Sequence, residues 1–167
     1  MLRHLSISTL LCLSLGACST LTDVPVGTPL SAIQQQFGQA NVACPTNNPT
    51  RFIWTSQPFG QYAWAVDTDK DQRLISSRQV LTDAEFDLLR QGQWNKERVW
   101  CHFGPPAEQD ITPYKGVKMQ VWTYRYKQNS AWDSLMHVYF NKNEIVQHHH
   151  PAPDLLKTEQ WEAFRPF

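Results

Sequence analysis

The feature that most limits the fold of this 167-residue chain is a pattern that occurs twice, 66 positions apart. Each copy is a short amphipathic segment that ends at a glycine, Gly38 in the first copy and Gly104 in the second. Apolar residues recur at helical spacing in both segments, and a glycine supplies the left-handed residue on which many helices end. The pattern therefore predicts two equivalent helices, with Thr28 and Asn95 as their N-terminal caps.

Three strand-like runs follow each predicted helix, rich in β-branched and aromatic residues and separated by polar turn residues. The runs are RFIWTS, QYAWAVD and RLISSRQV in the first half, and QVWTYRY, LMHVYFN and EIVQHH in the second. Side chains alternate between the two faces of a strand. In QVWTYRY this places Trp122, Tyr124 and Tyr126 on one face, which we expect to pack against the helices.

These elements predict an α+β fold, namely a tandem duplication of a helix, or helix pair, followed by a three-stranded antiparallel sheet. The second half is expected to begin with an extra helix, because Thr82 and Glu85 have the spacing of a capping box. We expect a first unit over residues 18–80, a second unit over 81–150, and a tail over 151–167 that can form a short terminal helix.

The first 17 residues resemble the signal peptide of a bacterial lipoprotein. Their start is basic, and the apolar run over 5–15 is shorter than the roughly 20 residues that span a membrane. Residues 15–18, Leu-Gly-Ala-Cys, resemble a lipobox, in which the thiol of Cys18 accepts the lipid. Several acyl chains on Cys18 would hold the chain firmly at a membrane. The alternative is an ordinary cleaved signal with a chance cysteine.

Ser19 follows the predicted lipidation site, whereas lipoproteins kept in the inner membrane typically carry Asp there. The resemblance therefore implies a lipid anchor in the outer membrane, with the rest of the chain facing the periplasm. Without the signal peptide the chain has 14 Lys and Arg against 15 Asp and Glu. This near neutrality argues against a nucleic-acid partner, which would favour a basic surface.

Two further cysteines, Cys44 and Cys101, remain after the lipidated one. The oxidising periplasm allows such a pair to form a disulfide. Two buried free thiols are the alternative, because sequence does not show whether the Cβ atoms meet.

The second half of the chain resembles the SmpA/OmlA lipoproteins, the BamE family, over roughly residues 82–149. GQWNKERVWCHFGPPA, VWTYRY and LMHVYFNKNEIV carry the resemblance: a capped helix, Gly-x-Pro and an aromatic strand pair follow one another. The first half matches more loosely, because Gln39 and Ala40 follow its glycine. Two such units in tandem also resemble the β-lactamase-inhibitor-like fold.

The family resemblance implies a non-enzymatic accessory lipoprotein that supports β-barrel assembly and envelope integrity by binding other envelope proteins. The expected partner is the β-barrel assembly machinery. A contact segment of the family corresponds to EQDITPYKG here, which makes Asp110, Pro113 and Tyr114 candidate partner-binding residues. The alternatives are an inhibitor-like module that binds a periplasmic enzyme and an envelope lipoprotein that binds a small ligand.

An alternating acidic stretch, Asp67, Asp69 and Asp71, resembles a calcium loop at first sight. An EF-hand loop needs Gly at its sixth position and Glu at its twelfth, where this chain has Gln72 and Arg78. A polar hairpin turn is therefore expected instead.

No catalytic residue, cofactor or metal site is expected elsewhere. The tract His148 to His150 is expected at the end of a strand, where its side chains alternate between faces and do not easily reach one ion. Cys101 and His102 are a conceivable nucleophile pair, but adjacent helical residues point about 100° apart. A structural role is favoured for both.

Overall fold

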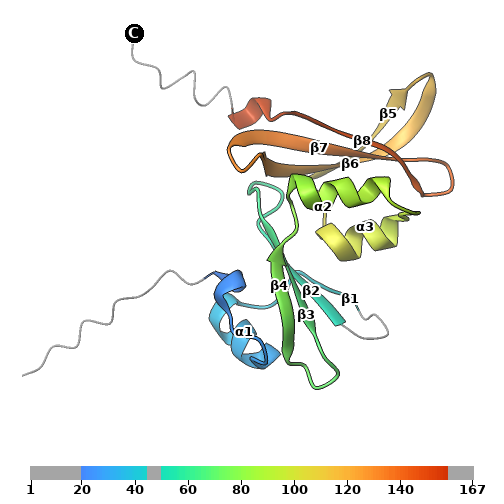
Figure 1. The fold of residues 1–167 in the computed structure, drawn as a ribbon. Helices are drawn as coiled ribbons and strands as arrows, with labels where there is room; N and C mark the ends of the chain where they lie inside the picture. Colours follow the sequence, from blue (N-terminus) through green and yellow to red (C-terminus); the bar gives the residue numbers. More distant parts are fainter. Residues whose placement is uncertain (1–19, 45–49, 158–167) are drawn as a thin grey trace, which may run out of the picture.

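The computed structural model describes residues 20–44 and 50–157. Its helical segments are the 3₁₀ turns η1 (Leu21–Asp23) and η2 (Leu88–Arg90), and the helices α1 (Leu30–Phe37), α2 (Asp83–Asp87) and α3 (Lys96–Phe103). Its strands are β1 (Val42–Cys44), β2 (Thr50–Thr55), β3 (Ala63–Thr68), β4 (Leu74–Gln79), β5 (Glu108–Tyr114), β6 (Val117–Gln128), β7 (Trp132–Phe140) and β8 (Val146–Pro153). They form two antiparallel meanders, β1-β2-β3-β4 and β5-β6-β7-β8 (Figure 1).

The expected α+β duplication with three-stranded sheets is wrong. The described chain is mostly β, with two four-stranded antiparallel sheets and few, short helices. The unexpected strands are β1 and β5, which precede the three expected strands in each half. Three residues are too few for β1 to show a period, and most β5 side chains are exposed, so neither segment has the apolar alternation of a half-buried strand.

The elements lie in four layers (Figure 1). α1 covers one face of the first sheet, where Leu30 and Ile33 share a buried cluster with Val66 of β3. Ala63 and Ala65, on the opposite face of β3, belong to a second cluster that includes residues of α2 and α3. The α2–α3 pair therefore lies between the two sheets, and one face of the second sheet looks outward.

A single hydrophobic core joins both sheets through the α2–α3 pair. Phe86 of α2 and Phe103 of α3 stack with ring centroids 4.7 Å apart. Both rings contact Tyr124 of the second sheet, with centroids 6.0 and 5.8 Å away. On the other side, Ile53 of the first sheet approaches the end of α3 so closely that a Cβ on Gly104 would lie 2.9 Å from its Cγ2.

The helix caps follow the sequence closely in the second half. The Asn95 side chain accepts a hydrogen bond from the N–H of Arg98 at 2.8 Å, as a cap should. Thr82 likewise accepts from the N–H of Glu85 at 3.2 Å. The carboxylate of Glu85 does not complete the expected capping box, because it is engaged by side chains of other elements, described below.

The first helix begins one residue later than expected. Pro29 occupies the N-cap position, and the Thr28 hydroxyl donates to the carbonyl of Pro25 rather than capping the helix. The predicted ends are confirmed, since Gly38 and Gly104 both follow their helices with φ of 80° and 82°.

Two other expectations concern turns and boundaries. The Asp67–Asp71 stretch forms the expected hairpin turn, in which the Asp69 carboxylate accepts from two backbone N–H groups. β8 continues through Pro153, beyond the expected boundary at 150, and a helical turn starts at Leu155.

In the part of the chain that is described, no helix is long and apolar enough to cross a membrane.

Gly104→Ala is expected to destabilise the fold more than Gly38→Ala. Both positions have a positive φ that costs a non-glycine residue about 1–3 kcal/mol. Only at Gly104 does the new Cβ meet a neighbour, Ile53, whereas a Cβ at Gly38 meets nothing within 4 Å. Urea unfolding followed by tryptophan fluorescence measures both losses, and equal losses would contradict the close approach to Ile53.

Candidate functional site

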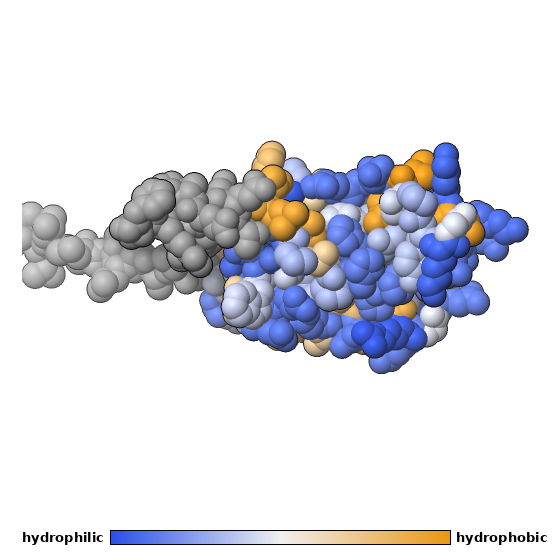
Figure 2. Space-filling view, turned by 90° about the horizontal axis from the view of Figure 1, so that it is seen from above, coloured by the Kyte–Doolittle hydropathy of each residue, from blue (hydrophilic) through white to orange (hydrophobic). Residues whose placement is uncertain are grey.

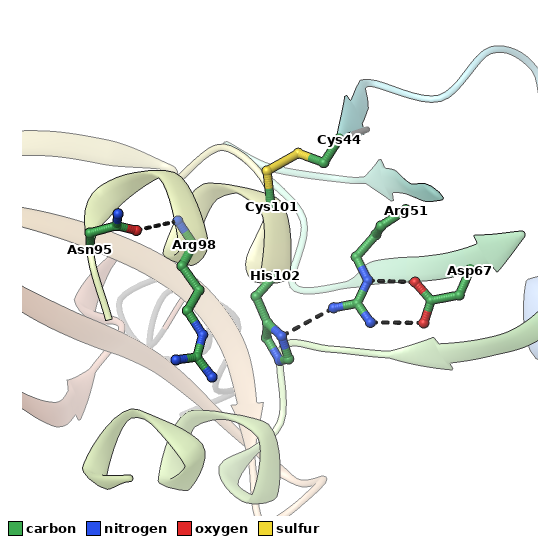
Figure 3. Close-up of a disulfide and its surroundings, with 7 residues drawn as sticks. All are labelled: Cys44, Arg51, Asp67, Asn95, Arg98, Cys101 and His102. Atoms are coloured by element: carbon green, nitrogen blue, oxygen red, sulfur yellow. Dashed lines mark hydrogen bonds and ion pairs between the residues drawn. A yellow bond between two sulfur atoms is a disulfide. The ribbon is translucent and has the colours of Figure 1, made fainter. Parts of the chain in front are cut away.

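A disulfide between Cys44 and Cys101 joins β1 to α3 (Figure 3). The two Cα atoms are 5.7 Å apart, within the usual range for a bridge. Of the two alternatives for these cysteines, the structure therefore has the disulfide. It links the edge of the first sheet to the helix pair across 57 positions of sequence.

A closed ring of five polar and charged side chains lies beside the disulfide, and three of them, Arg51, Asp67 and His102, are drawn in Figure 3. Arg51 donates to both carboxylate oxygens of Asp67, at 2.6 and 2.8 Å. Arg78 reaches the same carboxylate at 3.4 Å and that of Glu85 at 3.0 Å. His102 closes the ring, 2.6 Å from Glu85 and 3.1 Å from Arg51. The ring thus ties three strands of the first sheet to both helices of the pair.

The two partners of His102 determine its tautomer. An arginine can only donate, so Nδ1 of His102 accepts from Arg51, and Nε2 carries the proton that is donated to Glu85. Burial lowers the pKa of His102 and outweighs the opposing effect of the Glu85 carboxylate. Both ring nitrogens are engaged and the sulfur of Cys101 is bridged, so the conceivable Cys–His pair has no free thiol.

The two carboxylates of the ring keep their charge in spite of burial. Burial raises the pKa of Asp67, but hydrogen bonds and charge from Arg51 lower it on balance. Burial likewise raises the pKa of Glu85, and the hydrogen bond from His102 with the charge of Arg78 lowers it on balance. The ring therefore holds fixed charges in a partly buried place.

A cavity of about 890 Å³ opens next to the disulfide and the ring. Its lining combines apolar side chains, among them Val42, Leu88 and Trp100, with charged ones. The guanidinium of Arg98 lies over the Trp94 ring, 3.9 Å from its centroid. The cavity is thus bounded by the edge of the first sheet on one side and by α3 on the other.

A second candidate surface is β5, which carries all three candidate partner-binding residues. The segment EQDITPYKG forms an edge strand that, among the described residues, pairs only with β6, and the chain then turns at Lys115 and Gly116. Asp110 and Tyr114 share one face of this strand by alternation, and Pro113 faces the other way. Asp110 and Pro113 are exposed, and Tyr114 is half-buried.

Tyr114 belongs to a group of rings on the outer face of the second sheet, which we call the outer-face cluster. Its ring stacks on His148 at 4.8 Å and lies 5.0 Å from Tyr139. Tyr139 in turn stacks on His150 at 5.3 Å, and His150 lies 5.5 Å from His137. Seen from this side, the surface is mostly hydrophilic, with separate apolar patches (Figure 2).

The histidine tract alternates between faces, as expected, but it lies within β8 rather than at its end. His148 pairs with Tyr139 and His150 with His137, so both face outward, while His149 pairs with Val138, which is in the core between the sheets. Sequence reasoning missed His137. An antiparallel register counted from the β7–β8 turn would have placed it opposite His149, because the irregularity between Tyr139 and Phe140 shifts the pairing by one residue.

The predicted lipidation site, Cys18, lies outside the described residues. Within the described ranges, no group of three or more His, Cys, Asp or Glu side chains is placed to hold a metal ion.

Comparison of the chain with family models, with curated proteins and with solved structures finds no match.

The free energy of unfolding is expected to fall as the pH drops from 7 to 5, and His102→Gln is expected to reduce that fall. The lowered pKa of His102 means that below about pH 6.5 the unfolded chain takes up a proton before the folded chain does, so acid favours unfolding. One such proton changes the free energy by at most about 1.4 kcal/mol per pH unit.

Urea unfolding at pH 7, 6 and 5 checks this expectation. In the His102→Gln variant, the side-chain amide keeps a donor for Glu85 and an acceptor for Arg51, but it does not titrate. The lowered pKa values of Glu85 and Asp67 act in a separate window, because their stabilisation is complete above about pH 4.5 and is lost at lower pH. An unchanged slope between pH 7 and 5 in the variant would contradict the assignment to His102.

Proposed function

We propose that this chain is a non-enzymatic outer-membrane lipoprotein that binds another envelope protein through the free edge of β5. The family resemblance makes a subunit of the β-barrel assembly machinery the expected partner. A lipid on Cys18 would confine the chain to the membrane surface, which raises the effective concentration of a membrane-bound partner. Even a modest contact area would then suffice for association.

The observation that carries this proposal is the outer edge of β5, with which no other strand pairs in the described part of the chain. An edge strand presents unpaired backbone N–H and C=O groups, to which an extended segment of another protein can add as a further strand. β5 is seven residues long, and Ile111 near its centre has a side chain that is 67% exposed. Most side chains of β5 are exposed.

Pro113 limits where a partner strand can pair. Proline has no N–H to donate, and within sheets it is confined to edge strands and bulges. We therefore expect pairing over the first part of β5, with the exposed carboxylate of Asp110 beside it. Glu108 is already paired with Arg125 at 2.8 Å, so a basic side chain of the partner would complement the charge of Asp110.

A photo-cross-linking residue in place of Ile111 is expected to capture a subunit of the β-barrel assembly machinery in intact cells. The matched control is Ile75, which is also exposed, at 45%, but lies on β4, an edge strand of the first sheet. Equal capture from positions 111 and 75, or none from 111, would contradict the proposal.

The cavity beside the disulfide favours one alternative, a lipoprotein that binds a small ligand. Its volume of about 890 Å³ is in the range of ligand-binding pockets, and Trp94 and Trp100 contribute aromatic surface. Native mass spectrometry of the purified acylated protein would detect a retained small molecule. Trp100→Ala should release that molecule if the cavity holds it.

A further inference from the structure

We infer that the outer face of the second sheet holds a surface site for a late first-row divalent metal ion, with His148 and His150 as its two imidazole ligands. Cu²⁺ is the ion expected to bind most tightly, because it heads the affinity order of such ions for nitrogen ligands. The inference goes beyond the proposed function, since neither partner binding at β5 nor a lipid anchor requires it.

The distance between two ring nitrogens carries the inference. Nε2 of His148 and Nδ1 of His150 are 3.1 Å apart. Two imidazole nitrogens that bind one ion lie about 2.05 Å from it, so a separation of this size corresponds to an angle of about 98° at the ion. This angle falls between the square-planar and tetrahedral values, so the nitrogens already have the spacing of two ligands of one ion.

Only a small rearrangement separates the observed pair from a chelate. At present one of the two nitrogens carries a proton and donates it to the other. The ion would take the place of this proton, and each ring would turn about its Cβ–Cγ bond so that both lone pairs converge. This torsion is broad and soft in histidine, so the turn costs little.

The sheet holds the two imidazoles in this arrangement. Residues two apart on a strand share a face, so His148 and His150 both project outward from β8. Tyr114 stacks on the ring of His148 with an interplanar angle of 17°, and Tyr139 stacks on the ring of His150 with an angle of 21°. Rings that are already ordered lose less conformational entropy when an ion binds.

Metal ligation requires the neutral ring. As the side chains stand, the site has two protein ligands, consistent with the absence of any three-residue set among the described residues. Water and the facing His137, across the strand from His150, are the sources of further ligands.

The test is a Cu²⁺ titration of the full chain, purified in detergent without a polyhistidine tag, followed by calorimetry and electron paramagnetic resonance. His148→Ala and His150→Ala should each weaken binding by more than the 10–100-fold typical for loss of an outer-shell partner. His149→Ala is the matched control, because this side chain belongs to the opposite face of β8, and it should leave the affinity unchanged.

Three results would overturn the inference: no Cu²⁺ binding by the unsubstituted chain, unchanged binding in both ligand variants, or an equal loss in the His149 variant. Thermal unfolding without metal shows whether each variant is folded. If an alanine variant unfolds, His148→Gln and His150→Gln, which keep a polar side chain of similar reach, replace it. A change of the nitrogen hyperfine pattern from two coordinated nitrogens to one in either variant would support two imidazole ligands.

Discussion

The structure depends most on the packing of the α2–α3 pair between the two sheets. The stacked rings of Phe86 and Phe103 contact Tyr124 of the second sheet, while Ile53 of the first sheet reaches the end of α3. Helices this short are not stable alone in water, so the two sheets that bury them determine their form. The charged ring and the Cys44–Cys101 disulfide cross the same boundary and reinforce it.

This arrangement has a consequence for function. The inner face of the second sheet is filled by the core, which leaves its outer face and the β5 edge as the surfaces that a rigid scaffold presents. The two proposals use different parts of that sheet: backbone groups along β5 for a protein partner, and imidazoles on β8 for a metal ion. Tyr114 lies on β5, the strand proposed to bind a protein, and its ring packs on His148, one of the proposed metal ligands. The two surfaces therefore adjoin.

Local sequence signals predicted the helix ends and the buried face of β6, but not the four-stranded sheets or the charged ring. Helix ends at Gly38 and Gly104, the Asn95 cap and the inward face with Trp122, Tyr124 and Tyr126 all follow from spacing and residue type. β5 was missed because an exposed edge strand has no apolar alternation. The charged ring and the pairing of His137 with His150 depend on which strands and helices become neighbours in the folded chain. A single sequence does not give this information.

The central claim is that both sheets share one cooperative core. Hydrogen exchange followed by mass spectrometry, at increasing urea concentrations, tests it most directly. Peptides that cover β3 (63–68) and β7 (132–140) report on the first and the second sheet. One shared core predicts that both peptides open with the same free energy and the same dependence on urea. Opening of β3 at lower urea, with β7 still protected, would contradict the account.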